Sequence, residues 1–375
     1  MDFNGFSAET LSVIGEGAGN NYEDALTFPI FMTSTFGFGS EFSYSRCDNP
    51  TRKALERTAA ALEKGKFGFA FSSGLAAVSA LFSLFKSGDR IIISDDVYGG
   101  TYRLADRIFA KYGIIFDFLD LTDEKIFEKI RGAKLVFAES PTNPMMKIIP
   151  IAKIASVCRE EHVLFAVDNS FLTPYYQNPL TLGADIVLHS ATKYLSGHHD
   201  ATAGLIVVND ETLAERLKLI SNTVGSALSP FDSFLVLRGI KTLPLRMEKH
   251  SENAHQAALF LNQHKNVKSV IYPALESHRG RKICASQSRG FGGIVSFYVK
   301  NSFPAEKLFR GGKIIKFAES LGGARTLITY PFTQTHYSLP PERKHALGIT
   351  ETLFRLSLGL ENINDILGDL AEMLE

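Results

Sequence analysis

The sequence predicts an α/β fold, in which helices cover a mostly parallel sheet and a smaller C-terminal α+β domain follows. The chain has 375 residues, more than the roughly 250 to 300 at which a single hydrophobic core stops growing. Short apolar runs alternate with longer stretches of helical period from about residue 51 to 220, a pattern typical of strand–helix units. After about residue 245 the pattern changes to long helices and glycine-flanked strands. We therefore expect two hydrophobic cores.

The elements of the first region follow from its apolar runs, which have the length and composition of buried strands. The expected strands are FGFAF (67–71), RIIIS (90–94), KLVFAE (134–139), VLFAVD (163–168) and ADIVLHS (184–190). Between them lie stretches that are amphipathic or apolar enough to cover a sheet, at 73–86, 101–113 and 151–161. In the second region we expect a strand at 292–300 and a final helix after Asn362.

The same pattern divides the chain into three parts. Residues 1–50 lack a clear period and are expected to form an extended arm, residues 51–245 the large α/β domain, and residues 246–375 the smaller domain. The run GEGAG (15–19) invites comparison with a nucleotide-binding loop. Such a loop needs a strand before it and a helix after it, and neither is evident here.

The composition narrows the range of partners. Lys+Arg and Asp+Glu both number 40 and charge runs are absent, so we expect a small-molecule partner and no nucleic acid. The three scattered cysteines give neither a disulfide framework nor a metal cluster, which is typical of a reducing cytoplasm. The start MDFNGFSAET does not resemble a signal peptide, and no stretch reaches the roughly 20 apolar residues that span a bilayer. The expectation is a cytoplasmic protein without membrane contact.

Polar residues follow each expected strand of the first region. Because ligands bind beyond the carboxyl ends of the strands in such sheets, we expect these residues to form one composite site. The clusters are Ser72–Gly74, Asp95–Tyr98, Ser140–Pro144, Asp168 and Ser190–Lys193.

Lys193 is the residue on which the chemical prediction depends. A lysine just past a buried strand could bind an aldehyde cofactor covalently, while the hydroxyls of Ser190 and Thr192 bind its phosphate. Such a lysine becomes nucleophilic when desolvation lowers its pKa. The alternative is a Ser/Thr pair that caps a helix beside a solvated lysine.

Three further clusters favour the cofactor. Asp168 ends an apolar strand, where an unpaired carboxylate is costly, and a protonated pyridine nitrogen would pair with it and remain an electron sink. Ser73 and Gly74 begin a helix whose free N–H groups and dipole attract phosphate. Tyr98 can lay its ring against the cofactor, although a structural tyrosine is the alternative.

Six segments, spread in order over almost the whole chain, match the motifs of one known family: YSRCDNPTRKALE, FSSGLAA, DDVYGGT, VDNSF, SATKYLSGHHD and RLSLGLEN. In these segments the chain resembles the PLP-dependent Cys/Met metabolism family, where PLP is pyridoxal 5′-phosphate. That family contains cystathionine γ-synthase, cystathionine β- and γ-lyases, methionine γ-lyase and homoserine-ester sulfhydrylases. It implies an aspartate aminotransferase-like fold of type I and a homotetramer, built from two dimers that share each active site.

The resemblance also implies roles for single residues. Lys193 would form the Schiff base and shuttle protons, Asp168 would pair with the pyridine nitrogen, and Tyr98 would stack on the ring and accept the proton of the incoming amine. Phosphate would be bound by Gly74, Leu75, Ser190 and Thr192, together with Tyr44 and Arg46 from the neighbouring subunit. The substrate α-carboxylate would be held by Asn143, Ser320 and Arg355, the arginine through a bidentate fork.

Distal contacts decide the reaction within this family. Glu319 resembles the acid that several cystathionine-handling relatives place near the far amino group of the substrate, and Gly100 replaces the cysteine of methionine γ-lyases. Cys47, Asp48 and His199 depart from the usual pattern and leave substrate detail open. We expect a cystathionine lyase of either β or γ type, with γ-replacement on an acylated homoserine as the alternative.

Two other classes of protein share part of this pattern. A serine hydrolase could use Ser190 as nucleophile and Lys193 as base, but the SDN and KTG elements that accompany such a pair are missing. A non-catalytic binding protein of the same fold would not need Lys193, Asp168 and Arg355 together. His198, His199 and Asp200 do not have the spacing of a metal site, and no metal is expected.

Overall fold

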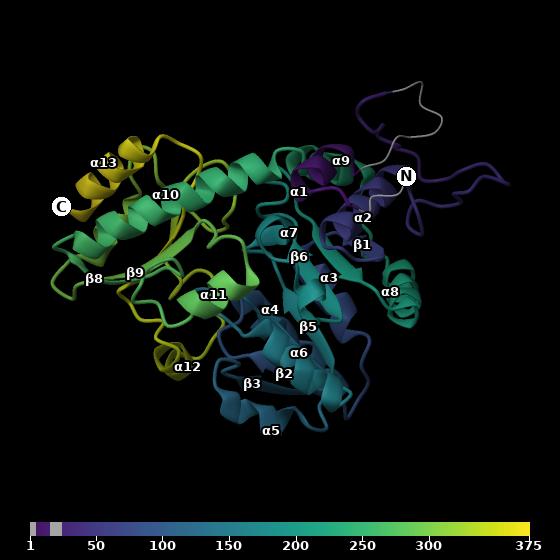
Figure 1. The fold of residues 1–375 in the computed structure, drawn as a ribbon, viewed down its shortest axis with the longest axis horizontal. Coiled ribbons are helices and arrows are strands. Elements are labelled where there is room, and N and C mark those ends of the chain that lie inside the picture. Colours follow the sequence, from purple (N-terminus) through teal and green to yellow (C-terminus); the bar gives the residue numbers. More distant parts are fainter. Residues whose placement is uncertain (1–4, 16–24) are drawn as a thin grey trace.

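The structure, a computed structural model, describes residues 5–15 and 25–375. Within that part of the chain it contains two sheets, one of seven strands and one of five (Figure 1). The remaining residues of the predicted arm, with most of the GEGAG run, lie outside the described residues. No helix in the described ranges is long and apolar enough to cross a membrane.

The larger sheet has the strand order β1-β7-β6-β5-β4-β2-β3. Its strands are β1 (Phe67–Phe71), β2 (Arg90–Ser94), β3 (Ile115–Leu119), β4 (Leu135–Glu139), β5 (Leu164–Asp168), β6 (Ile186–Ser190) and β7 (Gly204–Val208). The five strands from β6 to β3 pair in parallel, while β7 is antiparallel to both of its neighbours. The predicted mostly parallel sheet is therefore confirmed, and β3 and β7 are strands that the sequence reading does not include.

Helices cover both faces of this sheet. Those on one face are α3 (Gly74–Phe82), α4 (Gly99–Arg107) and α8 (Glu211–Val224). Those on the other face are α2 (Pro50–Leu62), α5 (Phe127–Ile130) and α6 (Ile151–Glu160). Ile91 and Ile93 pack with the first group and Ile92 with the second, as the period of two along a strand requires. Because both faces are buried, the strands read as continuous apolar runs.

The smaller sheet has the order β10-β11-β12-β9-β8. Its strands are β8 (Val267–Ile271), β9 (Ile294–Val299), β10 (Lys316–Phe317), β11 (Leu327–Thr329) and β12 (Leu353–Ser357). Two helices, α10 (Leu243–Gln263) and α13 (Ile363–Leu374), contribute to its hydrophobic core. Figure 1 shows α10 running from the side of the larger sheet to the smaller one. The expected strand near 292–300 and the final helix are confirmed.

Shorter elements complete the described chain. They are α1 (Ala8–Ile14), α7 (Thr173–Tyr176), α9 (Pro230–Ile240), α11 (Arg281–Gln287), α12 (Pro341–Ala346) and the 3-10 turns η1 (Phe109–Tyr112), η2 (Glu124–Ile126), η3 (Pro179–Leu182) and η4 (Ala305–Arg310). Helix α1, capped by Ser7, lies in the segment that the sequence predicts to be extended. The boundaries at residues 50 and 245 stay a prediction.

Candidate active site

A cavity of about 340 Å³ lies beyond the carboxyl ends of the parallel strands and is also lined by residues near the smaller sheet. All predicted site residues except Tyr44 and Arg46 line it: Ser73, Gly74, Leu75, Tyr98, Asn143, Asp168, Ser190, Thr192, Lys193, Glu319, Ser320 and Arg355. The order of the parallel strands explains this, because it places the residue after each strand at one edge. Glu319, Ser320 and Arg355 come from the smaller sheet and its loops.

Lys193 lies in the turn that follows β6, where its backbone N–H donates to the carbonyl of Ser190 at 3.1 Å. Its Nζ donates to the hydroxyl of Ser320 at 3.1 Å. Burial lowers the pKa of Lys193 to about 8, and the positive charge of Arg355 acts in the same direction. A much larger share of this amine is therefore unprotonated near neutral pH than of a solvated lysine, which is the form a nucleophile or a base needs.

Asp168 and Glu139 are the last residues of two paired strands and lie opposite each other in the register. Asp168 accepts the backbone N–H of Ser170 at 2.9 Å. Burial raises the pKa of both carboxyls, and the negative charge of Asp168 raises that of Glu139 further, well above its usual value. A cation bound at this edge would relieve the cost of holding Asp168 ionised.

Glu139 is a site residue that the sequence reading missed. Its Oε1 accepts the backbone N–H of Tyr98 at 2.9 Å, which fixes the start of α4 relative to β4. The residue ends the expected strand 134–139, so the strand-end rule applied to its last residue would have found it. It also lines the cavity.

The start of α3 forms one wall of the cavity. Ser73 caps the helix, its hydroxyl accepting the N–H of Ala76 at 3.0 Å. A Cβ at position 74 would lie 2.8 Å from Cβ and 2.9 Å from Oγ of Ser190, so Gly74 allows the helix to approach the end of β6. The helix start therefore lies next to Ser190, with free N–H groups that suit a phosphate.

Arg355, on β12, joins the two halves of the site. Its Nη1 donates to Oδ1 of Asn143 at 2.8 Å and its Nη2 to the carbonyl of Ser320 at 2.9 Å. Burial lowers its pKa to about 10, so the guanidinium remains charged at neutral pH. Among the described residues, its Nε–H has no hydrogen-bond partner. A buried cation with a free donor at a cavity wall is suited to bind a carboxylate.

His336, which the sequence reading did not assign to the site, holds Asn143 from behind. Its Nε2 lies 3.0 Å from the backbone carbonyl of Asn143, and its Nδ1 lies 2.9 Å from the hydroxyl of Thr335. Burial lowers the pKa of His336 to about 3, so the ring is neutral. Since a carbonyl can only accept, Nε2 carries the proton and donates it, and the Thr335 hydroxyl donates to Nδ1.

Tyr98 lies at the start of α4 with 38% of its surface exposed. A Cβ at position 100 would lie 2.4 Å from Cε1 of the Tyr98 ring, so only glycine at position 100 avoids a clash with the ring in this position. Burial raises the pKa of Tyr98. Stacking on the cofactor and acceptance of the amine proton both stay predictions for this residue.

Tyr44 and Arg46 lie away from the cavity of their own chain. Tyr44 is 45% exposed, and the Arg46 guanidinium lies 5.4 Å from the centre of its ring and donates to the carbonyl of Asn222. Their predicted place in the site of a neighbouring subunit stays a prediction. Within residues 5–15 and 25–375 no group of three or more His, Cys, Asp or Glu side chains is arranged to hold a metal ion.

The cavity presents the groups that an aldehyde cofactor with a pyridine ring and a phosphate needs. Lys193 provides an amine with a lowered pKa. Asp168 provides a buried carboxylate whose ionised form a bound cation would stabilise. The close approach of Gly74 to Ser190 offers helix N–H groups and a hydroxyl to an anion. The residues present therefore fit PLP.

Comparison with known proteins agrees with this chemistry. A family model described as Cys/Met metabolism PLP-dependent enzyme matches residues 9–375. A cystathionine beta-lyase of Lactococcus lactis subsp. cremoris (strain MG1363) is 47% identical over 361 residues, which are 94% of each chain. A cystathionine gamma-lyase of Bacillus subtilis (strain 168) is 44% identical over 374 residues, 98% of this chain and 99% of the relative. The crystal structure of a cystathionine gamma synthase from Xanthomonas oryzae pv. oryzae in complex with cystathionine has a TM-score of 0.95 at 36% identity, covering 98% of each chain.

Proposed function

The chain belongs to the Cys/Met metabolism PLP-dependent enzyme family, and we propose that within this family it is a lyase that cleaves a carbon–sulfur bond of cystathionine. That it is a PLP-dependent enzyme of transsulfuration follows from the family. The observation that supports a reaction on an α-amino acid is the position of the Lys193 amine, 3.1 Å from the hydroxyl of Ser320 in the cavity that Arg355 also lines.

We assign the cofactor to the residues that fit it. Lys193 would bind its aldehyde carbon, Asp168 would pair with the pyridine nitrogen, and the ring of Tyr98 would lie against the cofactor. Phosphate would be bound by the start of α3 at Ser73, Gly74 and Leu75, and by Ser190 and Thr192. When bound, PLP supplies a sink for the electron pair left on the substrate α-carbon.

The chain's own residues hold the substrate and move its protons. Arg355 and Asn143 bind the α-carboxylate, with the free Nε–H of Arg355 as a further donor. Nζ of Lys193 takes the proton from the α-carbon, for which its pKa of about 8 suits it. The same amine then returns a proton to the departing sulfur. In β-elimination the Cβ–S bond breaks, one water molecule is consumed, and the products are homocysteine, pyruvate and ammonia. In γ-elimination the Cγ–S bond breaks, one water molecule is consumed, and the products are cysteine, 2-oxobutyrate and ammonia.

Glu319 favours cystathionine as the substrate. It is exposed, lines the cavity and precedes Ser320, so its carboxylate lies on the same wall as the Lys193 partner. Cystathionine carries a second ammonium group at the far side of the sulfur, and a carboxylate there would bind it. Methionine, which lacks this group, would gain nothing from Glu319.

A second candidate reaction is γ-replacement, in which cysteine displaces the acyl group of an acylated homoserine. The structural similarity to a cystathionine gamma synthase, with a TM-score of 0.95, supports γ-replacement as the alternative reaction. Both reactions use the same carboxylate site and the same lysine.

The test offers the purified protein cystathionine alone, then O-acetyl- or O-succinylhomoserine with cysteine. We expect keto acid from cystathionine alone, pyruvate marking β-elimination and 2-oxobutyrate marking γ-elimination. Lys193→Ala serves as the control and should give neither. Absence of keto acid together with cystathionine formed from the homoserine ester would refute the lyase and establish the alternative.

We further propose a cytoplasmic homotetramer in which Tyr44 and Arg46 complete the neighbour's phosphate site. The free thiols of all three cysteines and the exposure of Tyr44 support it. Mixing Arg46→Ala with Lys193→Ala subunits, after dissociation and reassociation, should restore part of the activity, because a hybrid dimer then has one intact shared site. No gain over the separate variants would contradict shared sites, and sedimentation would give the subunit number.

A further inference from the structure

Asn143, the partner of Arg355, lies in a turn that spans residues 142–147 between β4 and α6. Bonds within the turn close it: the Thr142 N–H donates to the carbonyl of Lys147 at 3.0 Å, and the Met146 N–H to the carbonyl of Thr142 at 3.1 Å. The Lys147 N–H also donates to the hydroxyl of Thr142 at 2.9 Å. Internal bonds of this kind shape the turn but do not position it in the protein.

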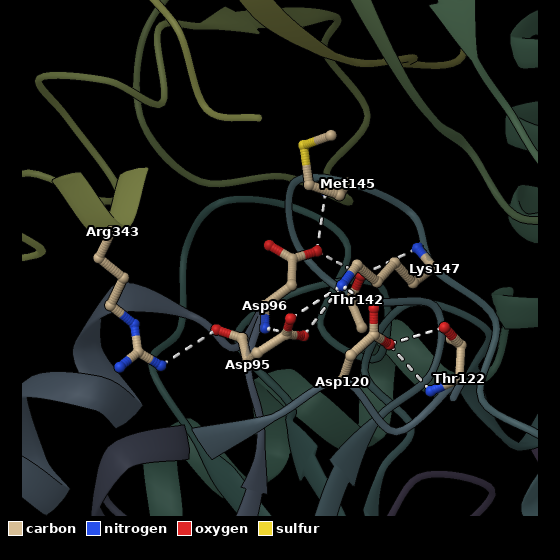
Figure 2. Close-up of polar contacts among 8 residues, drawn as sticks. All are labelled: Asp95, Asp96, Asp120, Thr122, Thr142, Met145, Lys147 and Arg343. Carbon is tan, nitrogen blue, oxygen red and sulfur yellow. Dashed lines mark hydrogen bonds and ion pairs between the residues drawn. The ribbon is translucent and has the colours of Figure 1, made fainter. Parts of the chain in front are cut away.

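Asp96 supplies a bond from outside the turn. Figure 2 shows its carboxylate facing the turn from the segment after β2. A single oxygen, Oδ2, accepts both the Thr142 hydroxyl and the N–H of Met145, the latter at 3.1 Å. These two donors lie on either side of Asn143 in the chain. Asp96 is also two residues before Tyr98, so it links the segment of the stacking ring to the segment of the carboxylate site.

The burial of Asp96 shows that this link is costly. The residue is fully buried, and burial raises its pKa to about 7. Among the described residues its second oxygen, Oδ1, has no hydrogen-bond partner. An apolar side chain would fill the same space without that cost, so a buried carboxyl here indicates a requirement for its acceptor oxygen.

Other contacts from outside the turn reach its backbone carbonyls: Nε2 of His336 donates to Asn143 at 3.0 Å, the Ser296 hydroxyl donates to Pro144 at 2.7 Å, and Nε2 of His278 lies 3.1 Å from the carbonyl of Met146. Lys147 lies at the far end of the turn. Nζ of Lys147 donates to Asp95 at 3.0 Å and to Asp120 at 2.7 Å, in a partly exposed cluster where the charges are screened (Figure 2). The guanidinium of Arg343 lies over the rings of Tyr102 and Phe118 and donates to the carbonyl of Asp95 at 3.5 Å, not to its carboxylate. The two carboxylates hold the side chain of Lys147, whereas Asp96 accepts from Thr142 and Met145, the residues that flank Asn143 and Pro144.

We propose that Asp96 is a positioning residue for the substrate-carboxylate site: by accepting from Thr142 and Met145 it fixes Asn143, and through Asn143 the guanidinium of Arg355. The inference rests on the proposed function, since it takes Arg355 as the group that binds the α-carboxylate. Asp96 itself does not line the cavity.

Three variants separate the acceptor from the charge. Asp96→Ala removes the acceptor, and Thr142→Val removes the matching hydroxyl while keeping the shape of the side chain. Asp96→Asn keeps one acceptor oxygen and loses the charge, so it should still accept from Thr142 and Met145 and keep Asn143 in position. Asp117→Ala is the matched control, because Asp117 pairs with Arg90 at 3.0 Å on a partly exposed edge strand of the same sheet.

The first readout compares two probes that differ only in the carboxylate. L-Serine and ethanolamine are titrated into the holoenzyme, and binding is followed by the visible absorbance of the cofactor. We expect Asp96→Ala and Thr142→Val to weaken L-serine binding by about tenfold, the loss of one or two hydrogen bonds. Ethanolamine binding should stay within about twofold, and Asp96→Asn should bind L-serine within about threefold of the wild type.

The second readout uses the cofactor-free protein. Amide hydrogen exchange of residues 142–147 should become faster in Asp96→Ala and Thr142→Val and remain unchanged in Asp117→Ala. Should Asp96→Ala fail to fold, Thr142→Val tests the same link from its other side.

The outcomes distinguish the two proposals. L-Serine binding unchanged in both variants, or L-serine and ethanolamine weakened equally, would overturn the positioning role. A wild-type protein that binds L-serine but releases no keto acid from cystathionine would refute the lyase. The positioning role of Asp96 would then still be tested by comparing L-serine and ethanolamine binding in the variants. If the wild type binds no α-amino acid, unchanged exchange in the turn would still overturn the link.

Discussion

Gly74 and Gly368 allow one substitution to be tested in two environments. Each lies in a helix, Gly74 at the start of α3 and Gly368 inside α13. In a helix, alanine is favoured over glycine by up to about 1 kcal/mol. The space around the two positions is different. A Cβ at position 74 would lie 2.8 Å from Cβ of Ser190, whereas nothing lies within 4 Å of one at position 368.

The expected effects therefore have opposite signs. Gly368→Ala should raise the free energy of unfolding by about 0.5 to 1 kcal/mol. In Gly74→Ala, α3 or the end of β6 must move, and overpacking of this kind costs about 1 to 3 kcal/mol. Subtracting the helix gain, we expect Gly74→Ala to lower the free energy of unfolding by up to about 2.5 kcal/mol.

The same movement should affect the cofactor, because Ser190 and the start of α3 are the residues to which we assign its phosphate. If 1.4 kcal/mol of the strain were relieved by opening that site, the dissociation constant of PLP would rise about tenfold. Gly368→Ala, far along the chain in α13, should leave it unchanged.

Urea unfolding of the cofactor-free variants measures the first effect, and titration with PLP followed by visible absorbance measures the second. A midpoint for Gly74→Ala equal to or above that of Gly368→Ala, with wild-type affinity for PLP, would refute the claim that glycine is required for the approach to Ser190.

Three other predictions follow from single residues. Because burial lowers the pKa of Lys193 to about 8, the fraction of its amine that is unprotonated increases as the pH rises through that value. The rate at which the cofactor-free protein gains visible absorbance when PLP is added should therefore rise with pH, with a midpoint near 8. A midpoint near the ordinary lysine pKa of about 10.4 would contradict this prediction. Arg355→Lys should raise KM for cystathionine about tenfold or more, since an ammonium cannot reproduce the fork to Asn143 and Ser320, and steady-state kinetics with an unchanged cofactor spectrum would show it. Asp369→Ala should lower the free energy of unfolding by about 2 to 4 kcal/mol in urea with little change in KM, because this buried carboxylate accepts three backbone N–H groups, those of Lys313, Ile314 and Ile315, at 2.8 to 2.9 Å. Wild-type stability of that variant would argue against it.

Much of the site could be predicted from strand ends alone. The clusters at Ser73, Tyr98, Asp168 and Lys193 each follow an apolar run, and the parallel arrangement places such residues at one edge whatever the details of packing. Glu139 is not predicted as a site residue because it is the last residue of an expected strand, although it lines the cavity.

Other features have no local signal. The pair Asn143–Arg355 joins residues 212 positions apart, and only the resemblance to a family suggested that both act on one group. Strand β7 is an apolar run, and its amino-acid sequence does not indicate whether it pairs in parallel or antiparallel. Its antiparallel pairing with β1 and β6 depends on tertiary packing. Edge strand β3 is half exposed and contains Asp117, which hides it among polar segments.

Arg355 belongs to one sheet and its partner Asn143 to a loop of the other. This division has a consequence for recombining the enzyme with its relatives. A hybrid that took residues up to the start of α10 from this chain and the rest from another parent would inherit the guanidinium and the amide oxygen from different sources. Its catalytic competence would depend on how well that one 2.8 Å contact is reproduced across the seam, more than on the overall likeness of the two parents.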